Sequence, residues 1–387
     1  MLSATRLVRF TYRGRARTIR TNFSTIAVKG AQSLNAPVMV CSRLKMPQAR
    51  LECSSMSPRE SSRAVDVVGV GINATDTIIR LPHFPAPDSK IELLSAEVAP
   101  GGQVASAIVA CRRWGLSARY VGKIGSDAPG RLQRREMQRD GIEAHWIMAR
   151  GCQSQIAFIL VDETSGERTI LWRRDPKIAL RPEDLERRWI LGAQALLVDG
   201  HDTEAAARAA RWAREESIPV VGDFDNLYSR VEELLEQVDF PVTSQLFPEK
   251  LTGEGDLLKS LPKILSRFKC RLIATTLGPL GVLAWDGRDF FLSPAFRVRA
   301  IDTTGAGDVF HGGFLYGLIA GWSPQEILEF SNAAAALNCT ASGARGYIAS
   351  LGEIERLRLI DERSQRAYTE EALREAARAA LVTGAPA

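Results

Sequence analysis

The chain has 387 residues, of which 45% are hydrophobic and 25% are charged, the balance of an ordinary globular protein. No apolar stretch reaches the roughly 18 residues that a membrane-spanning helix needs, so we expect no membrane partner. The net charge is +5, but residues 1–51 contain ten Lys and Arg and no Asp or Glu, which leaves the remainder acidic. The body therefore gives no basic surface that would indicate nucleic acid as a partner. The six cysteines lack C-x-x-C spacing, which favours reduced thiols over a metal or redox site.

Residues 1–63 form a leader whose composition differs from that of the rest. They are rich in Arg and Ser, poor in acids and without a long apolar core, which resembles an organellar transit peptide more than a secretory signal. A translation start assigned too early is an alternative, because Met56 precedes the first clear strand by only nine residues. A functional arm is the third interpretation. All three predict poor order before about residue 62. We expect a cytoplasmic protein, or an organellar one if the transit peptide is genuine.

From residue 65 the hydrophobic pattern alternates between short β-branched runs and longer stretches with helical spacing. In chain order we predict a strand at 65–70, an edge strand at 91–98, helix 104–114, strand 119–121, helix 128–140 with Asp127 as N-cap, a hairpin at 156–172, strand 195–198, helix 203–216, strands 219–222 and 272–275, a hairpin at 282–292, and helices 306–320 and 324–340.

This alternation predicts an α/β fold built on a doubly wound, mostly parallel sheet with helices on both faces. The stretches 72–98 and 145–172 do not fit such a sheet, so we predict that they form a small β lid. The domain would span 64–352, and a charged, helix-prone tail would occupy 353–387.

The segment that carries most chemical information is Asp-Thr-Thr-Gly-Ala-Gly-Asp at 302–308, which leads into an apolar helix. A glycine-rich turn at a helix N-terminus presents unpaired N–H groups and the positive end of the helix dipole, and so can bind an anion. An aspartate in the first turn, Asp308, can accept a proton from an attacking hydroxyl at the same place. A tight turn with a capping aspartate is the alternative interpretation.

In its full length this segment resembles the second signature of the ribokinase (PfkB) family of carbohydrate kinases, and the resemblance extends over about 65–350. It implies a ribokinase-like fold and transfer of phosphate from ATP with Mg²⁺. Asp308 would be the catalytic base. Gly305, Ala306 and Gly307 would form the anion hole that holds the transferred phosphate.

The resemblance also implies a substrate site near the N-terminus of the domain. Its candidate residues are Asn73, Asp76, Gly101, Gly102, Gln103 and Ser106. A carboxylate such as Asp76 can accept two hydroxyl donors, which suits a polyol, although a turn or cap residue is the alternative. Ser106 stands where the family usually has Asn, and it lacks that side chain's donor and reach.

Nucleotide contacts are implied for five residues, namely Thr276, Gly278, Gly281, Asn332 and Gly343. The first three belong to a strand-to-loop segment that resembles the family's ATP-phosphate loop. The last two belong to a helix and loop that resemble its adenine side. Small residues there also serve plain helix packing.

One motif departs from the family. The usual Asn-x-x-Glu, which organises Mg²⁺ and phosphate through water, is replaced here by Ser244 and Phe247, and Glu249 is out of register. Such departures occur in ketohexokinase-like members, which the stretches 84–91 and 165–170 also resemble.

Many members bind a monovalent cation beside the anion hole. By resemblance Asp302 and the Thr304 backbone would be its ligands, and K⁺ is the expected ion. Asp302 as a turn former is the alternative.

The leading hypothesis is therefore ATP-dependent phosphorylation of a hydroxyl on a sugar or sugar-like molecule. A nucleoside kinase of the same fold and a non-catalytic sugar or nucleotide sensor remain alternatives. One of Arg168, Arg173 and Arg174 could reach a phosphate or an acidic substrate, or all could be solvated. Because lid-mediated dimers are common in the family, we expect a homodimer.

Overall fold

The computed structural model describes residues 5–12, 15–22, 65–164 and 168–360. The chain divides into two units, 1–55 and 56–387. The first contains an antiparallel hairpin of β1 (Thr5–Tyr12) and β2 (Arg15–Asn22), paired from Thr5↔Asn22 to Tyr12↔Arg15. The rest of the leader 1–63, including Met56, lies outside the described residues.

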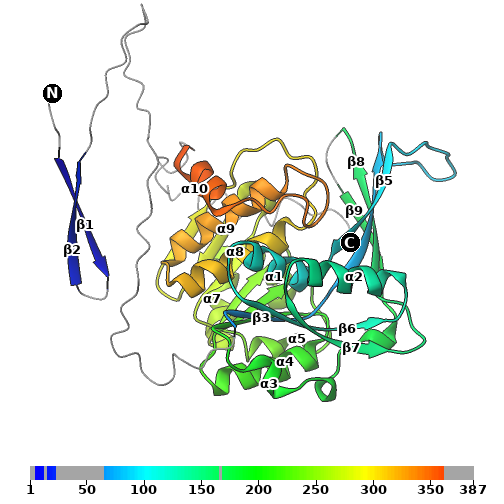
Figure 1. Cartoon of the computed structure of the whole chain (residues 1–387), viewed down its shortest axis with the longest axis horizontal. Helices are drawn as coiled ribbons and strands as arrows, with labels where there is room; N and C mark the ends of the chain where they lie inside the picture. The colour runs from blue at the N-terminus through cyan, green and yellow to red at the C-terminus, as the bar shows by residue number, and fades with distance from the viewer. Residues whose placement is uncertain (1–4, 13–14, 23–64, 165–167, 361–387) are drawn as a thin grey trace, which may run out of the picture. The chain divides into compact units, whose positions relative to one another are not determined.

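The second unit is built on a sheet of nine strands in the order β15-β14-β13-β12-β11-β10-β3-β6-β7 (Figure 1). Their bounds are β3 (Val67–Val70), β6 (Ala118–Gly125), β7 (Glu143–Ala149), β10 (Ala195–Asp199), β11 (Val220–Phe224), β12 (Phe240–Thr243), β13 (Ile273–Thr276), β14 (Val282–Trp285) and β15 (Phe290–Ser293). All neighbouring pairs are parallel except those of β14 with β13 and β15.

The strand order reverses between β3 and β10. The chain first adds β6 and β7 on one side of β3, and then adds β10 to β13 on the other. In open α/β sheets, ligands bind beyond the carboxyl ends of the strands at such a switch point. The topology therefore places the site where β3 and β10 end.

Helices cover both faces of the sheet (Figure 1). Successive residues of β10 point to opposite sides, so Leu196 and Val198 pack in one core, and Ala195 and Leu197 in the other. The first core lies against α3 (Arg187–Ile190), α4 (Thr203–Glu215), α5 (Val231–Leu235), α6 (Phe247–Thr252) and α7 (Leu257–Phe268). The second lies against α1 (Gln103–Arg113), α2 (Ala128–Arg139), α8 (Ala306–Ala320) and α9 (Pro324–Asn338). The remaining helices are α10 (Leu351–Ile360) and the short 3-10 turns Pro176–Ile178, Pro182–Asp184 and Gly278–Leu280.

Local sequence signals explain where several helices begin. The Asp127 side chain accepts a hydrogen bond from the Gly130 N–H at 3.1 Å, which confirms it as the N-cap of α2. A capping box of Ser323 and Glu326 opens α9, with Pro324 at its first position.

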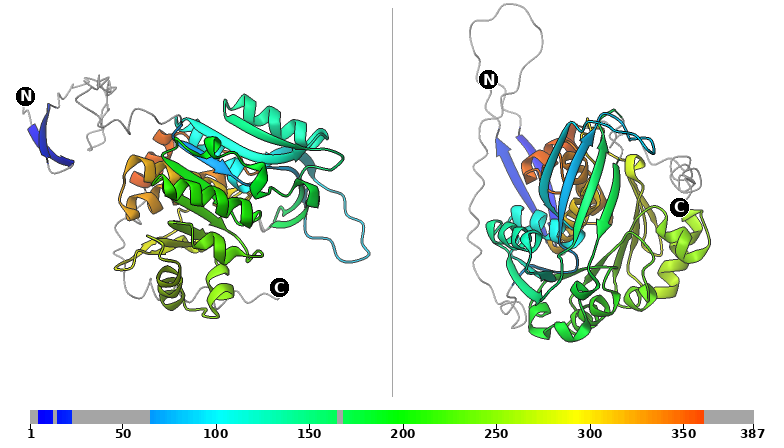
Figure 2. Two further views of the ribbon diagram at one scale, coloured as in Figure 1. Left: turned by 90° about the horizontal axis from the view of Figure 1, so that it is seen from below. Right: turned by 90° about the vertical axis from the view of Figure 1, so that its right-hand side faces the viewer.

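A separate four-stranded sheet forms the lid, in the order β5-β4-β8-β9 (Figure 2). Its strands are β4 (Ala74–Leu81), β5 (Ser95–Gly101), β8 (Ile156–Asp162) and β9 (Arg168–Arg173). The pairing places Ala99, Asp76, Ala157 and Trp172 in one cross-strand row, on the face that carries the buried Ile78.

The ribokinase-like α/β fold is confirmed, as are most of the predicted strands and helices, but several elements differ. The helices α5, α6 and α7 were not predicted. Residues 145–149, expected in the lid, belong to β7, which pairs with β6 at the edge of the main sheet. An amphipathic strand has the same pattern in either sheet, so sequence does not choose its neighbour. The strand β12 gave no signal because Pro241, which has no N–H for a ladder, lies inside it.

The predicted tail is helical at Leu351–Ile360, and residues 361–387 lie outside the described part of the chain. Among the described residues, no helix is long and apolar enough to cross a membrane. Cys111, Cys152, Cys270 and Cys339 are free thiols.

Candidate active site

The anion site was predicted at the N-terminus of α8. Gly305 has φ +73° and lies so close to Ala344 that a Cβ at this position would overlap the Ala344 backbone. Only glycine fits both the left-handed conformation and this contact. The N–H groups of Gly307 and Asp308 find no acceptor among the described residues, and no atom lies within 4 Å of a Cβ built on Gly307. Unpaired N–H groups at a helix N-terminus beside an open glycine position are what an oxyanion or phosphate site requires.

Asp302 holds the loop in front of this helix. Its carboxylate accepts the N–H groups of Thr304 and Gly343, both at 2.8 Å, and the Ala306 N–H donates to the Thr303 carbonyl at 3.3 Å. The structure thus shows Asp302 in the turn-forming role, with one backbone donor on each oxygen. The Thr304 hydroxyl is buried without a hydrogen-bond partner in the described part of the chain. A cation beside these residues remains a prediction.

The Asp308 carboxyl lies in the first turn of α8 and has a raised pKa. Burial raises its pKa to about 7, the neighbouring Asp223 raises it further, and the charges of His311 and Arg345 act in the opposite direction. A carboxylate whose pKa lies near the working pH combines a substantial ionised fraction with a strong affinity for the proton.

Asp76 lies on the lid strand β4 and is 4% exposed. Burial raises its pKa to about 7, Arg345 lowers it, and Asp302 raises it. A Cβ on Gly101 would overlap the Asp76 carboxylate, so the glycine leaves the room in which this carboxylate sits. Asp76 therefore stands as a buried acceptor beside the backbone of the glycine pair.

The turn between β3 and β4 brings Asn73 to the same place. The Ile72 N–H donates to the Asp199 carboxylate at the end of β10 at 2.6 Å, which fixes the turn. Gly102 has φ +91°, and a Cβ there would come 2.6 Å from the Asn73 Cα. Both polar atoms of the Asn73 side chain, and Oε1 of Gln103, are buried without partners among the described residues. Buried amides are normally satisfied, so these groups indicate a ligand that supplies the missing bonds.

Ser106 has a partner that sequence reasoning missed. Its Oγ accepts a hydrogen bond from Nε of Arg345 at 3.2 Å, and Nη2 of Arg345 donates to the Gly101 carbonyl at 2.9 Å. The sequence signal was a single Arg in a stretch of small residues, 341–346.

The candidate nucleotide residues divide into two groups. Gly278 has φ +56° with open space around it, and Thr276 donates through its hydroxyl to a carbonyl on β12 at 3.2 Å. Gly281 and Asn332 instead hold the protein together. A Cβ on Gly281 would overlap the Ser293 carbonyl, and Nδ2 of Asn332 donates to the carbonyl oxygens of residues 293 and 294 at 3.0 and 2.8 Å. Gly343, with φ +89°, lies under the lid near Ile78.

The two residues at the positions of the missing magnesium motif, Ser244 and Phe247, have structural roles. Phe247 is completely buried and packs against Phe224, and Ser244 donates to the Asp225 carbonyl at 2.8 Å. A different carboxylate, Asp223, stands at the carboxyl end of β11 and is 6% exposed. Burial raises its pKa well above the ordinary value, and Asp225 contributes in the same direction.

The partners of Asp223 connect it to the catalytic helix. Its Oδ2 lies 3.4 Å from Nδ1 of His311, which also contacts the Gly307 carbonyl at 2.7 Å. Neither Asp223 nor His311 was among the predicted site residues. The available signal was an acid at the end of a buried strand, which also marks many turns.

The three arginines of the lid region have different environments. Arg168 is exposed and donates to the Thr303 hydroxyl of the loop before α8, so it joins the lid to the anion site. Arg174 forms a partly buried ion pair with Asp202, with Nη1 at 2.9 Å from Oδ1. Arg173 is exposed.

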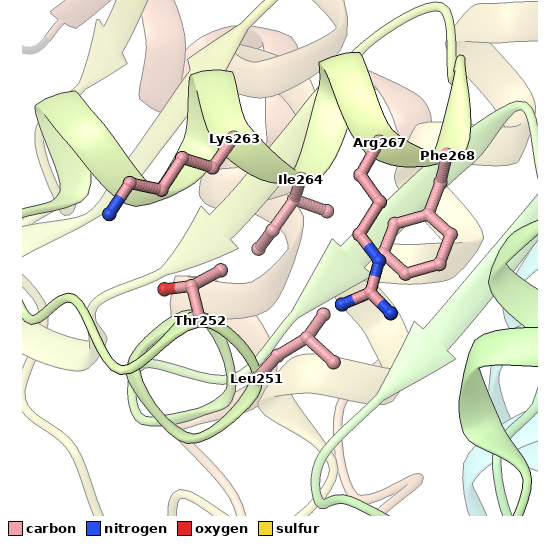
Figure 3. Close-up of a pocket in the computed structure, with 6 residues that line it drawn as sticks. All are labelled: Leu251, Thr252, Lys263, Ile264, Arg267 and Phe268. Atoms are coloured by element: carbon pink, nitrogen blue, oxygen red, sulfur yellow. The ribbon is translucent and has the colours of Figure 1, made fainter.

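A small pocket between α6 and α7 does not belong to this site (Figure 3). It lies on the opposite face of the sheet from α8, and it is lined by Leu251, Thr252, Lys263, Ile264, Arg267 and Phe268. It contains no carboxylate.

Comparison with known proteins agrees with this geometry. The model of the pfkB family carbohydrate kinases matches residues 65–349. The ATP-dependent ribose-1-phosphate kinase of Halopiger xanaduensis is 27% identical over 289 residues, which cover 73% of this chain and 94% of that protein. The ribokinase of Haemophilus influenzae is 29% identical, over 74% of this chain and 95% of the other. A ribokinase structure from Thermotoga maritima superimposes with a TM-score of 0.67 at 27% identity, over 76% and 99% of the two chains.

The chain belongs to the PfkB family of carbohydrate kinases, and the predicted resemblance is confirmed. It is an ATP-dependent sugar kinase, an enzyme that phosphorylates a sugar-like small molecule.

Raised carboxyl pKa values make the stability of the ligand-free protein depend on pH. Asp76 and Asp308 bind a proton more tightly in the folded than in the unfolded chain, so stability is greatest below about pH 4 and is lost as pH rises toward 7. As far as these two groups decide, we predict that the unfolding temperature falls by a few degrees between pH 5.5 and 8.

Asp308→Asn removes one of these carboxyls and should flatten that decline, as thermal unfolding followed by circular dichroism would show. Glu92→Gln, on the exposed loop before β5, is the control and should leave the slope unchanged. An Asp308→Asn variant with the slope of the original protein would contradict the assignment of the shift.

Proposed function

We propose that the enzyme transfers the γ-phosphoryl group of ATP to a hydroxyl of a sugar, with Asp308 as the general base. One observation carries the proposal. A carboxyl of raised pKa lies in the first turn of α8, beside N–H groups that have no acceptor among the described residues. Base and anion site thus occupy the same helix end, as in-line attack of a hydroxyl on a phosphate requires.

The residues around the N-terminus of α8 would have different roles in the reaction. Asp76 and Asn73 would hold the polyol, because one accepts hydroxyl protons and the other carries an unsatisfied donor and acceptor. Asp308 would take the proton of the hydroxyl oriented toward the phosphate. The amides of Gly307 and Asp308 would stabilise the negative charge on the phosphoryl oxygens. Arg168, from the lid, lies beside the same loop.

ATP is used by this class of kinase together with Mg²⁺, which neutralises charge on the β- and γ-phosphates. Mg²⁺ binds one or two carboxylates and otherwise phosphate oxygens and water. Asp223 fits that need, because it is a buried carboxylate whose charge raises the pKa of Asp308. We propose that Asp223 takes the place of the absent Asn-x-x-Glu.

A nucleoside kinase is the second candidate, and an aromatic cluster at the lid supports it. Trp172 lies in the same cross-strand row as Asp76 and is 56% exposed. It packs edge-on against His201, whose ring lies 4.3 Å from that of Tyr228. These rings could flank a planar base attached to the sugar.

A screen of ATP consumption over ketoses, aldoses, acidic sugars, sugar phosphates and nucleosides decides between these functions. We predict turnover with a sugar, and Asp308→Asn should lower kcat by at least about 10³-fold while the Kd for ATP stays within a factor of three. Turnover of nucleosides but of no sugar would identify a nucleoside kinase and contradict the sugar proposal. ATP binding without turnover of any compound would instead identify a sensor.

The Mg²⁺ role of Asp223 can be measured separately. Asp223→Asn should raise the Mg²⁺ concentration for half-maximal activity about tenfold or more, since the metal loses a charged ligand. Asp239→Asn is the matched control, because that carboxylate bonds the Val220 N–H at the opposite end of β11. Equal Mg²⁺ dependence in the two variants would exclude the role.

We also propose that two copies associate through the outer face of the lid. Val98, Phe158 and Leu171 lie in one cross-strand row with Thr77, and their side chains are 62%, 43% and 54% exposed. Such an apolar row on an exposed sheet is typical of an interaction surface.

Light scattering should therefore find a dimer, and Leu171→Lys should convert it to a monomer. Met148→Lys alters a comparably exposed side chain on β7 and should leave the dimer intact. If the unaltered protein is a monomer at micromolar concentration, the proposed dimer through the lid face is wrong.

A further inference from the structure

Arg345 is a buried cation that forms no ion pair within 4 Å among the described residues, and it is 8% exposed. The charges of Asp140, Asp76 and Asp308 act on it from farther away. Two of its three nitrogens are used, by the Ser106 hydroxyl and the Gly101 carbonyl. The third, Nη1, is buried and has no partner in the described part of the chain. Burying a charge in this way is unfavourable unless something pairs with it.

The position of the guanidinium is set by the fold and not by a flexible tether. Asp302 bonds the Gly343 N–H two residues before Arg345, and the Ala344 backbone lies against Gly305. Arg345 is thereby fixed to the anion site at one end and to the glycine pair at the other.

Its surroundings are those of the sugar subsite. Gly101, which accepts from Nη2, is also the residue whose missing Cβ leaves room for the Asp76 carboxylate. The charge of Arg345 acts on both Asp76 and Asp308, lowering their pKa values. Asn73, with two unsatisfied atoms, completes the set. The guanidinium of Arg345 therefore borders the proposed sugar subsite, and its Nη1 is the nitrogen left for a ligand.

Ser106, which stands where the family usually has Asn, helps to hold Arg345 in this position. Serine is too short to reach a substrate, but its hydroxyl accepts from Nε and supports the guanidinium. Unlike an amide, arginine carries a permanent charge and only donors. It is also the side chain best suited to carboxylate and phosphate oxygens.

We propose that Arg345 contacts the substrate through Nη1, and that its missing counter-ion is an anionic oxygen of the substrate itself. The preferred substrate is then a sugar that carries a carboxylate or a phosphate in addition to the hydroxyl that is phosphorylated. This inference rests on the proposed sugar kinase activity and specifies its substrate class.

The test compares matched pairs of compounds, an aldose with its aldonate and with its 1-phosphate. We expect the best acidic compound to exceed its neutral partner in kcat/KM by about 10- to 100-fold, the range of a hydrogen bond between charged groups. The carboxylate and phosphate arms of the panel show which anion is the natural one.

Arg345→Gln should remove most of that preference by raising KM for the acidic compound, while KM for ATP stays unchanged. Arg345→Lys keeps the charge and should retain part of the preference. Arg119→Gln is the matched control, because Arg119 is 7% exposed but lies at the amino end of β6, away from the site.

The outcomes separate this inference from the function on which it rests. Turnover of neutral sugars equal to that of acidic ones overturns the inference and leaves the kinase intact. So does an equal loss for both kinds of substrate in Arg345→Gln, which would make Arg345 a purely structural residue. If Arg345→Gln does not fold, the same comparison with Arg345→Lys decides. No turnover of any sugar overturns the proposed function itself.

Discussion

The active site depends on the contact between two loops that are distant in sequence, the one before α8 and the one after α9. Gly305 approaches Ala344 so closely that no side chain fits between them, and the Asp302 carboxylate joins the loops through the Gly343 N–H. This contact fixes the free N–H groups at the start of α8. It also positions Arg345, so one packing constraint fixes both the proposed anion site and the cation that we propose contacts the substrate.

Buried charge is the second constraint. Burial raises the pKa values of Asp76, Asp223 and Asp308, and the charges of Asp223 and Asp76 raise the pKa of Asp308 further. Such repulsion destabilises the ligand-free protein, but it also makes Asp308 a stronger base. The compensating charges are Arg345 within the chain and, in the proposed mechanism, the metal ion that arrives with ATP.

The sequence predicted most of the fold because strands and helices differ in hydrophobic period, and because the switch from one to the other recurs regularly. The prediction failed where a strand's hydrophobic pattern fits either of two sheets, and where a proline interrupts a strand. The edge strand β7 could not be separated from the lid, and Pro241 concealed β12. At the site it identified residues held by local backbone geometry, such as Gly305, but it assigned nucleotide contacts to Asn332, whose amide nitrogen is occupied by the 293–294 backbone.

By itself the sequence determined the family and identified the proposed catalytic aspartate and anion-binding turn, because each depends on a few consecutive residues whose conformation is local. Only the tertiary structure paired Ser106 with Arg345, 239 positions apart, and placed Asp223 beside the catalytic helix. The reason is physical: a side chain's charge and hydrogen-bonding capacity are local properties, whereas its partners and its burial depend on which distant segments pack around it.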